Sequence, residues 1–94
     1  MKKKIIFSDV SDIIMEELSI HFDKTGIDPS SFDEDTDLFK CGLIDSLDFL
    51  ELIEVLEKNH ALLFDFSNVL DLNISILKVF INEVVRQNIQ LNDS

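Results

Sequence analysis

Ninety-four residues, of which 46% are hydrophobic and eight are Phe, can form one domain with a modest core but not two. Two Gly, one Pro and no Trp or Tyr fit a sandwich or barrel poorly and favour helices. The net charge of −11, from 19 acidic and 8 basic residues, argues against binding to nucleic acid or anionic membranes and favours partners with basic patches.

The sequence shows no targeting or membrane-spanning pattern. The basic start, MKKKIIF, carries an apolar run from Ile5 to Phe7 that is too short for the core of a signal peptide. No stretch approaches the ~20 apolar residues that cross a bilayer. The single cysteine, Cys41, excludes an internal disulfide, and we interpret it as a partly buried structural residue. We therefore expect a cytoplasmic, monomeric protein with no membrane insertion.

The first periodic segment, from about Asp9 to Phe22, predicts an amphipathic helix. Ser8 is its expected N-cap. Apolar residues at helical spacing form the expected core face of this helix: Val10, Ile13, Ile14, Leu18 and Phe22. Gly26 marks the turn that follows the helix.

A long loop is predicted between Gly26 and Asp45, because this segment has no sustained period. Its own apolar residues could hold it to the core: Phe32, Leu38, Phe39, Leu43 and Ile44. The acidic run DEDTD, residues 33–37, has the alternating carboxylates of a calcium-binding EF-hand loop. That pattern next requires Gly at loop position six and Glu at position twelve, where this chain has Leu38 and Ile44. We expect a solvated acidic loop and no bound metal.

The second helix is predicted from Ser46 to Asn59, with two distinct faces. One face is apolar and should pack on the core: Phe49, Leu52, Ile53, Leu56 and His60. The opposite face is acidic with two aliphatic residues: Leu47, Asp48, Glu51, Glu54, Val55 and Lys58. We expect this second face to lie at the surface, and Leu50 falls between the two faces.

The remaining segment is less regular. Between Ala61 and Leu72, Ser67 could cap a short third helix, and a last helix is predicted after Asn73 as its N-cap. We thus predict a single all-α domain over residues 1–94: a small four-helix bundle of three long helices and one short third helix, with a long loop between helices 1 and 2. Residues 1–7 form the expected N-terminal extension, and residues 89–94 a frayed polar tail.

Ser46 lies where the loop becomes the second helix, and two interpretations of its hydroxyl stay open. It could cap the helix, or Asp45 could cap it one residue earlier and leave the hydroxyl free to carry a group. A catalytic serine is disfavoured, because His60 lies ~20 Å along the helix and no Gly-x-Ser-x-Gly elbow is present. A phosphate on Ser46 would lie near the backbone N–H groups of the helix start, and Asp45 and Asp48 would suit a divalent cation held by a modifying enzyme.

The segment LFKCGLIDSLDFLELIEVLEK, residues 38–58, resembles the central motif of the acyl carrier proteins and related peptidyl carriers. Gly42, then Asp45-Ser46-Leu47, then an acidic helix stand in the matching places. The resemblance extends more loosely to the whole chain. It implies that a phosphopantetheinyl transferase attaches 4′-phosphopantetheine from coenzyme A to Ser46, between Asp45 and Leu47, using Mg²⁺.

The resemblance further implies a carrier that is not itself an enzyme. The thiol of the arm would hold an acyl or aminoacyl group as a thioester and deliver it to loading and processing enzymes that dock on these residues: Leu47, Asp48, Glu51, Glu54 and Val55. Glu54, Val55 and the segment 61–72 depart from fatty-acid carriers, which leaves the cargo open among fatty acyl, polyketide and aminoacyl groups. The alternative is an unmodified, carrier-like interaction or regulatory module that acts through the acidic face alone.

Overall fold

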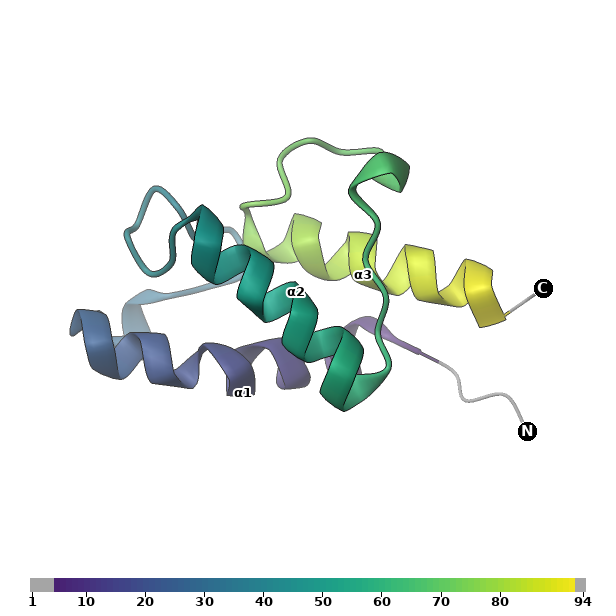
Figure 1. Cartoon of the computed structure of the whole chain (residues 1–94). Helices are drawn as coiled ribbons and strands as arrows, with labels where there is room; N and C mark the ends of the chain where they lie inside the picture. Colours follow the sequence, from purple (N-terminus) through teal and green to yellow (C-terminus); the bar gives the residue numbers. More distant parts are fainter. Residues whose placement is uncertain (1–4, 93–94) are drawn as a thin grey trace.

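The computed structural model describes residues 5–92, with side chains described as far as residue 88. It confirms the all-α fold class, with three α-helices in this part of the chain: α1 (Phe7–Thr25), α2 (Ser46–His60) and α3 (Leu77–Asn92). Single 3-10 turns lie in the two connections: η1 (Pro29–Ser31) and η2 (Phe66–Asn68). α2 and α3 both run antiparallel to α1, which brings the end of α1 and the start of α2 to the same side of the molecule (Figure 1).

The core lies between the three helices and is formed by the apolar faces predicted for α1 and α2. Sixteen apolar side chains of the described residues are buried in it. Phe80 of α3 is fully buried, and its ring centroid lies 4.8 Å from that of Phe49 and 5.3 Å from that of Phe64. Burying each such side chain stabilises the fold by about 1.5–3 kcal/mol. Ile13, predicted to be in the core, is only partly buried at its edge.

The start of α3 is stabilised by the long loop, so the N-cap predicted at Asn73 is wrong. The helix begins at Leu77, whose backbone N–H donates to Thr36 O at 3.0 Å, and Lys78 N–H donates to Glu34 O at 2.8 Å. These loop carbonyls accept from amides at the helix start, which have no partner within the helix. In other helices a capping side chain accepts from such amides. The long loop is thereby fixed against α3.

The start of α1 also differs from the prediction. Its N-cap is Ile6, without a side-chain hydrogen bond, and Ser8 lies inside the first turn. The helix starts earlier because Phe7 packs against the core and Val10 N–H donates to Ile6 O at 3.2 Å. Residues 1–4 of the expected N-terminal extension lie outside the described residues.

The predicted short third helix is replaced by an extended segment with one 3-10 turn, η2. Three polar side chains of α3 that are buried, Glu83, Gln87 and Asn88, hold this segment by its backbone. Asn88 Oδ1 accepts from Leu63 N–H at 3.0 Å, and Asn88 Nδ2 donates to Leu63 O at 2.9 Å. Gln87 pairs with both backbone groups of Asp65 in the same way, at 2.7 and 3.2 Å.

Glu83 completes this set at the far end of the segment. Its Oε1 accepts from Leu70 N–H at 2.9 Å and Asp71 N–H at 3.2 Å, while its Oε2 accepts from Arg86 Nη2 at 2.7 Å. Burial alone would raise the pKa of Glu83, but the hydrogen bonds from Arg86 and the two amides outweigh it and hold the pKa below its usual value. Polar side chains of α3 thus satisfy backbone groups of this segment that would bond to one another if the segment were helical.

The C-terminal end is helical further than predicted. α3 continues to Asn92, which includes most of the segment expected to be frayed, and residues 93–94 lie outside the described residues. In the part of the chain that is described, no helix is both long and apolar enough to span a membrane.

Candidate functional site

Asp45, not Ser46, caps α2. Its side-chain Oδ1 accepts from Asp48 N–H at 2.8 Å, and Asp48 Oδ2 accepts from Asp45 N–H at 3.2 Å. This reciprocal pair is a capping box, which satisfies two amides at the helix start. Ser46 therefore occupies the first helical position, its side chain exposed and its hydroxyl unused by the cap.

The loop before Ser46 is anchored on both sides of Gly42. Leu38, Leu43 and Ile44 are buried, and Ile44 N–H donates to Leu38 O at 3.3 Å, which closes the loop on itself. Gly42 has a φ of +83°, a conformation that other residues adopt only with strain. These anchors bury the apolar residues that precede the site and leave Ser46 facing out.

The acidic run of the loop has structural partners for each of its alternating carboxylates. Asp33 Oδ1 accepts from Asp35 N–H at 2.8 Å, and Asp35 forms an ion pair with Lys78. Asp37 Oδ1 accepts from Phe39 N–H at 3.0 Å, and its Oδ2 accepts from the Ser75 hydroxyl, also at 3.0 Å. Burial alone would raise the pKa of Asp37, but hydrogen bonds, above all from the backbone of Lys40, keep it lowered. Asp33 and Asp37 therefore cap turns within the loop, while Asp35 pairs with Lys78 of α3.

A cavity of about 710 Å³ opens beside Ser46. It lies between the end of α1, the loop and the start of α2, and ten residues line it: His21, Lys24, Thr25, Phe39, Gly42, Leu43, Ile44, Asp45, Ser46 and Asp48. Its position follows from the antiparallel packing of α1 and α2 (Figure 1). The sequence could not place His21, because its distance from Ser46 depends on how two helices pack.

Neither histidine is bonded to the serine within the described residues. His60 Nε2 lies 3.3 Å from Glu17 Oε1, at the opposite end of α2 from the cavity. His21 shares the cavity with Ser46, but no hydrogen bond in the described part joins the two side chains. A nucleophilic serine needs a base in hydrogen-bond reach and a group that orients the base, and the geometry provides no such pair.

The residues predicted for docking lie along the accessible surface of α2. Leu47 is 63% exposed, and Leu50, which the helical plot placed between the two faces, is 51% exposed. Asp48, Glu51 and Val55 line a second hollow of about 140 Å³ between α1 and α2.

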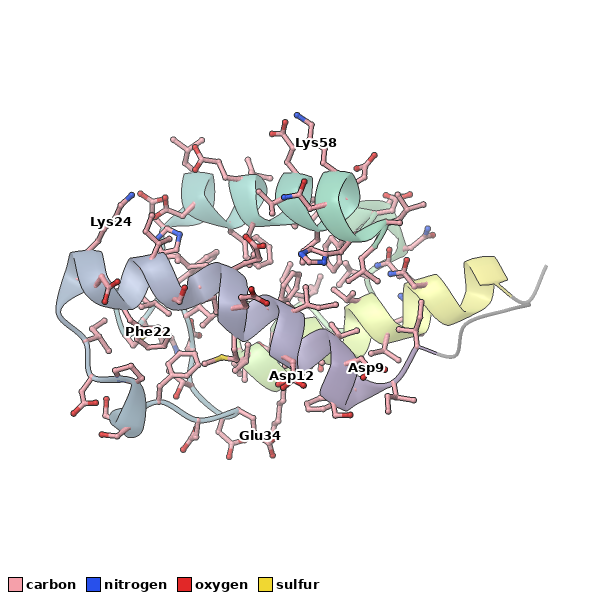
Figure 2. The ribbon with its side chains drawn as sticks, turned by 90° about the horizontal axis from the view of Figure 1, so that it is seen from below. Asp9, Asp12, Phe22, Lys24, Glu34 and Lys58 are labelled. Atoms are coloured by element: carbon pink, nitrogen blue, oxygen red, sulfur yellow. The ribbon has the colours of Figure 1, made fainter. Side chains whose placement is uncertain are left out.

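Glu54 lies on the same helix but outside that hollow, and it is paired with Lys58 at 2.7 Å. Lys58 projects from α2 away from the rest of the molecule (Figure 2). The hydrogen bond from Lys58 lowers the pKa of Glu54, and Lys58 also offsets part of its charge. Of the predicted acidic docking residues, Glu54 is the one with an ion-pair partner among the described residues.

Cys41 is exposed, so the prediction of a partly buried structural cysteine is wrong. Its thiol donates a weak hydrogen bond to Leu38 O at 3.7 Å.

Taken together, the helices form a small bundle that presents an exposed serine hydroxyl at the start of an acidic helix. Residues 22–78 match the family described as phosphopantetheine attachment site, and the chain belongs to this family. The matched segment contains the whole cavity except His21, and all of α2. Comparisons with curated proteins and with solved structures gave no match.

Membership of the family identifies the cofactor as 4′-phosphopantetheine, held covalently. The geometry fits such a group, because an exposed hydroxyl on the rim of an open cavity is accessible to a modifying enzyme and has room beside it for the arm. The resemblance noted from the motif around Ser46 is confirmed at the level of the family.

Proposed function

We propose that Ser46 is the attachment residue and that the chain works as a carrier of acyl or aminoacyl thioesters. The observation that carries this proposal is the capping box of Asp45 and Asp48, which leaves the Ser46 hydroxyl exposed and free. A serine used as the cap would have its oxygen occupied by a backbone amide. The thiol of the arm supplies the thioester chemistry when the cofactor is bound.

The chain's own part in the modification is to present one oxygen. Asp45 and Asp48 keep the helix start rigid, and both carboxylates line the same cavity as Ser46. Oxygen ligands of this kind suit a Mg²⁺ ion held by the transferase during phosphoryl transfer. The base that takes the serine proton is expected on the transferase, since the described residues offer none within hydrogen-bond reach of Ser46. We propose on this basis that the chain is a substrate and partner of enzymes in the cytoplasm and not itself an enzyme.

Docking is proposed on the accessible surface of α2, through Leu47, Asp48, Glu51, Glu54 and Val55. Leu47 is the apolar contact nearest the serine, and Leu50 extends the apolar surface by one turn. The carboxylates would attract basic patches on loading and processing enzymes. Charges at such a rim speed association without making the complex long-lived, which suits a carrier that visits several partners.

The intact mass of the protein tests the attachment site. After incubation with coenzyme A, Mg²⁺ and a broad-specificity phosphopantetheinyl transferase, we expect the mass of one added arm. Ser46→Ala should prevent the addition, and Ser30→Ala, at another exposed serine, should not. Wild-type protein that stays unmodified while a known carrier is labelled in parallel would refute the proposal.

The same exposed surface of α2 supports the alternative, an unmodified regulatory module. Variants tested in the native host distinguish the two functions. If Ser46→Ala retains full function and the double variant Glu51→Lys, Glu54→Lys loses it, the alternative holds. If Ser46→Ala alone abolishes function, the carrier proposal holds. Trapping the thioester from that host then identifies the cargo as fatty acyl, polyketide or aminoacyl.

A further inference from the structure

The two walls of the cavity beside Ser46 have opposite charge. Asp45 and Asp48 line it from the start of α2, while His21 and Lys24 line it from the end of α1. Figure 2 shows the Lys24 side chain at the end of α1, directed to the side of the molecule on which α2 lies.

We propose that the α1 wall of this cavity binds the phosphodiester of the arm, with Lys24 and His21 as its partners. The inference rests on the proposed attachment at Ser46 and adds a resting place for the arm. A phosphodiester on Ser46 brings one negative charge next to two carboxylates. The attraction that can offset this repulsion lies across the cavity, where the Lys24 ammonium is a compact charge on a long flexible stem and suits a phosphate oxygen.

Other residues of the cavity fit this assignment. Thr25 Oγ1 donates to His21 O at 2.7 Å and accepts from Ile27 N–H at 3.3 Å, which fixes the end of α1 and keeps the residues of the basic wall in place. Phe39, 40% exposed, adds an apolar surface to the lining. In 4′-phosphopantetheine a gem-dimethyl carbon lies one methylene beyond the phosphate ester oxygen, and this group would contact such a surface. The volume of about 710 Å³ lies within the ~300–1,000 Å³ of ordinary ligand pockets.

The second hollow, between α1 and α2, is a less favourable site for the phosphate. It shares His21 and Asp48 with the cavity, so the two are adjacent, but its other charged residues are Glu17 and Glu51. The negative potential of those carboxylates disfavours an anion there. The phosphodiester should therefore stay at the Lys24 end, and the arm should lie over the end of α1.

This placement would regulate access to the cargo. With the phosphodiester bound to Lys24, the arm lies beside the docking surface of α2 and leaves that surface free for a partner. A partner with a basic patch could then offer the phosphate a competing contact and release the arm only after docking. The arm would then be held on the carrier when the carrier is alone and released when a partner is bound.

The test uses the loaded protein with a nitroxide on the arm. A coenzyme A analogue that carries the nitroxide on its thiol is transferred to Ser46, and intact mass confirms the loading before any further measurement. Paramagnetic broadening of backbone amides by nuclear magnetic resonance then reports where the arm lies. We expect strong broadening for residues 21–25 and 39–42 and weak broadening for residues 54–58 on the outer part of α2.

Charge reversal provides the matched comparison. In Lys24→Glu the broadening at residues 21–25 should be lost and the phosphorus-31 resonance of the arm should shift, whereas Lys58→Glu, with the same change of charge on α2, should leave both unchanged. His21→Gln should weaken the broadening without abolishing it. Broadening that is equal on both faces in the wild type, or that survives Lys24→Glu in a protein with unchanged circular dichroism, overturns the proposal. Failure of the loading step would instead refute attachment at Ser46.

Discussion

Replacing the buried Glu83 by Ala should destabilise the fold. The change removes the acceptor of the Leu70 and Asp71 amides and leaves Arg86 without its carboxylate. Buried amides without a partner cost ~1–3 kcal/mol each, but these two lie on exposed residues and recover water, so ~1 kcal/mol remains for the pair. Breaking a buried ion pair costs ~3–5 kcal/mol, which we discount to ~1–2 kcal/mol because Arg86 keeps 26% of its side-chain surface exposed.

The sum, a loss of about 2–3 kcal/mol, corresponds to a fall in Tm of roughly 10–20 °C for a domain of this size. Far-UV circular dichroism in urea is the suitable assay, because the chain has no Trp or Tyr for fluorescence. With an m-value of ~1 kcal/mol per molar, the urea midpoint should fall by ~2–3 M. Glu54→Ala is the control, since it removes an exposed carboxylate that pairs with Lys58 at the surface and should leave the midpoint nearly unchanged. Equal midpoints for the two variants would show that Glu83 does not hold the segment in place.

Three further outcomes follow from the same contacts. Asp45→Ala should cost about 1 kcal/mol by urea unfolding because it removes the N-cap of α2, and Asp45→Asn, which can still accept the amide, should restore most of it. Gly42→Ala should cost about 1–2 kcal/mol, all of it backbone strain, because an added Cβ meets no atom within 4 Å while φ is +83°; a neutral result would mean that the loop adopts another conformation. Since the pKa of Glu83 is lower in the folded state, its contribution is complete above the ordinary glutamate pKa of ~4.3 and is lost as pH falls through its folded value. Acid titration should therefore destabilise the wild type more than Glu83→Gln.

The sequence was sufficient to predict the features that depend on local order. The period of α2 predicted both its faces and, within one residue, its bounds. Asp45 and Ser46 could be weighed as caps because capping preferences act over a single turn. The attachment motif is also local, since Gly42 and the three residues from Asp45 to Leu47 stand within one short segment.

The features that were missed depend on contacts between distant segments. The start of α3 could not be predicted from Asn73, because its amides find partners in the carbonyls of Glu34 and Thr36. The short third helix was predicted from the capping residue Ser67, but the backbone of that segment is held by α3. A signal was present in the sequence: Glu83, Gln87 and Asn88 fall on the inward side of α3 beside Val84, where polar side chains need partners.

Asp37 joins these distant contacts to the site. One of its oxygens caps the turn at Phe39, which leads to Gly42 and on to Ser46, and the other accepts from Ser75 just before α3. The backbone bridge between Asp37 and Ile76 reinforces the same junction. The position of Ser46 therefore depends on α3 through the loop, and not on α2 alone. A serine held from both sides by hydrogen-bonded backbone gives the proposed arm a fixed point of attachment, so the movement that a carrier needs would reside in the arm and not in the fold that presents it.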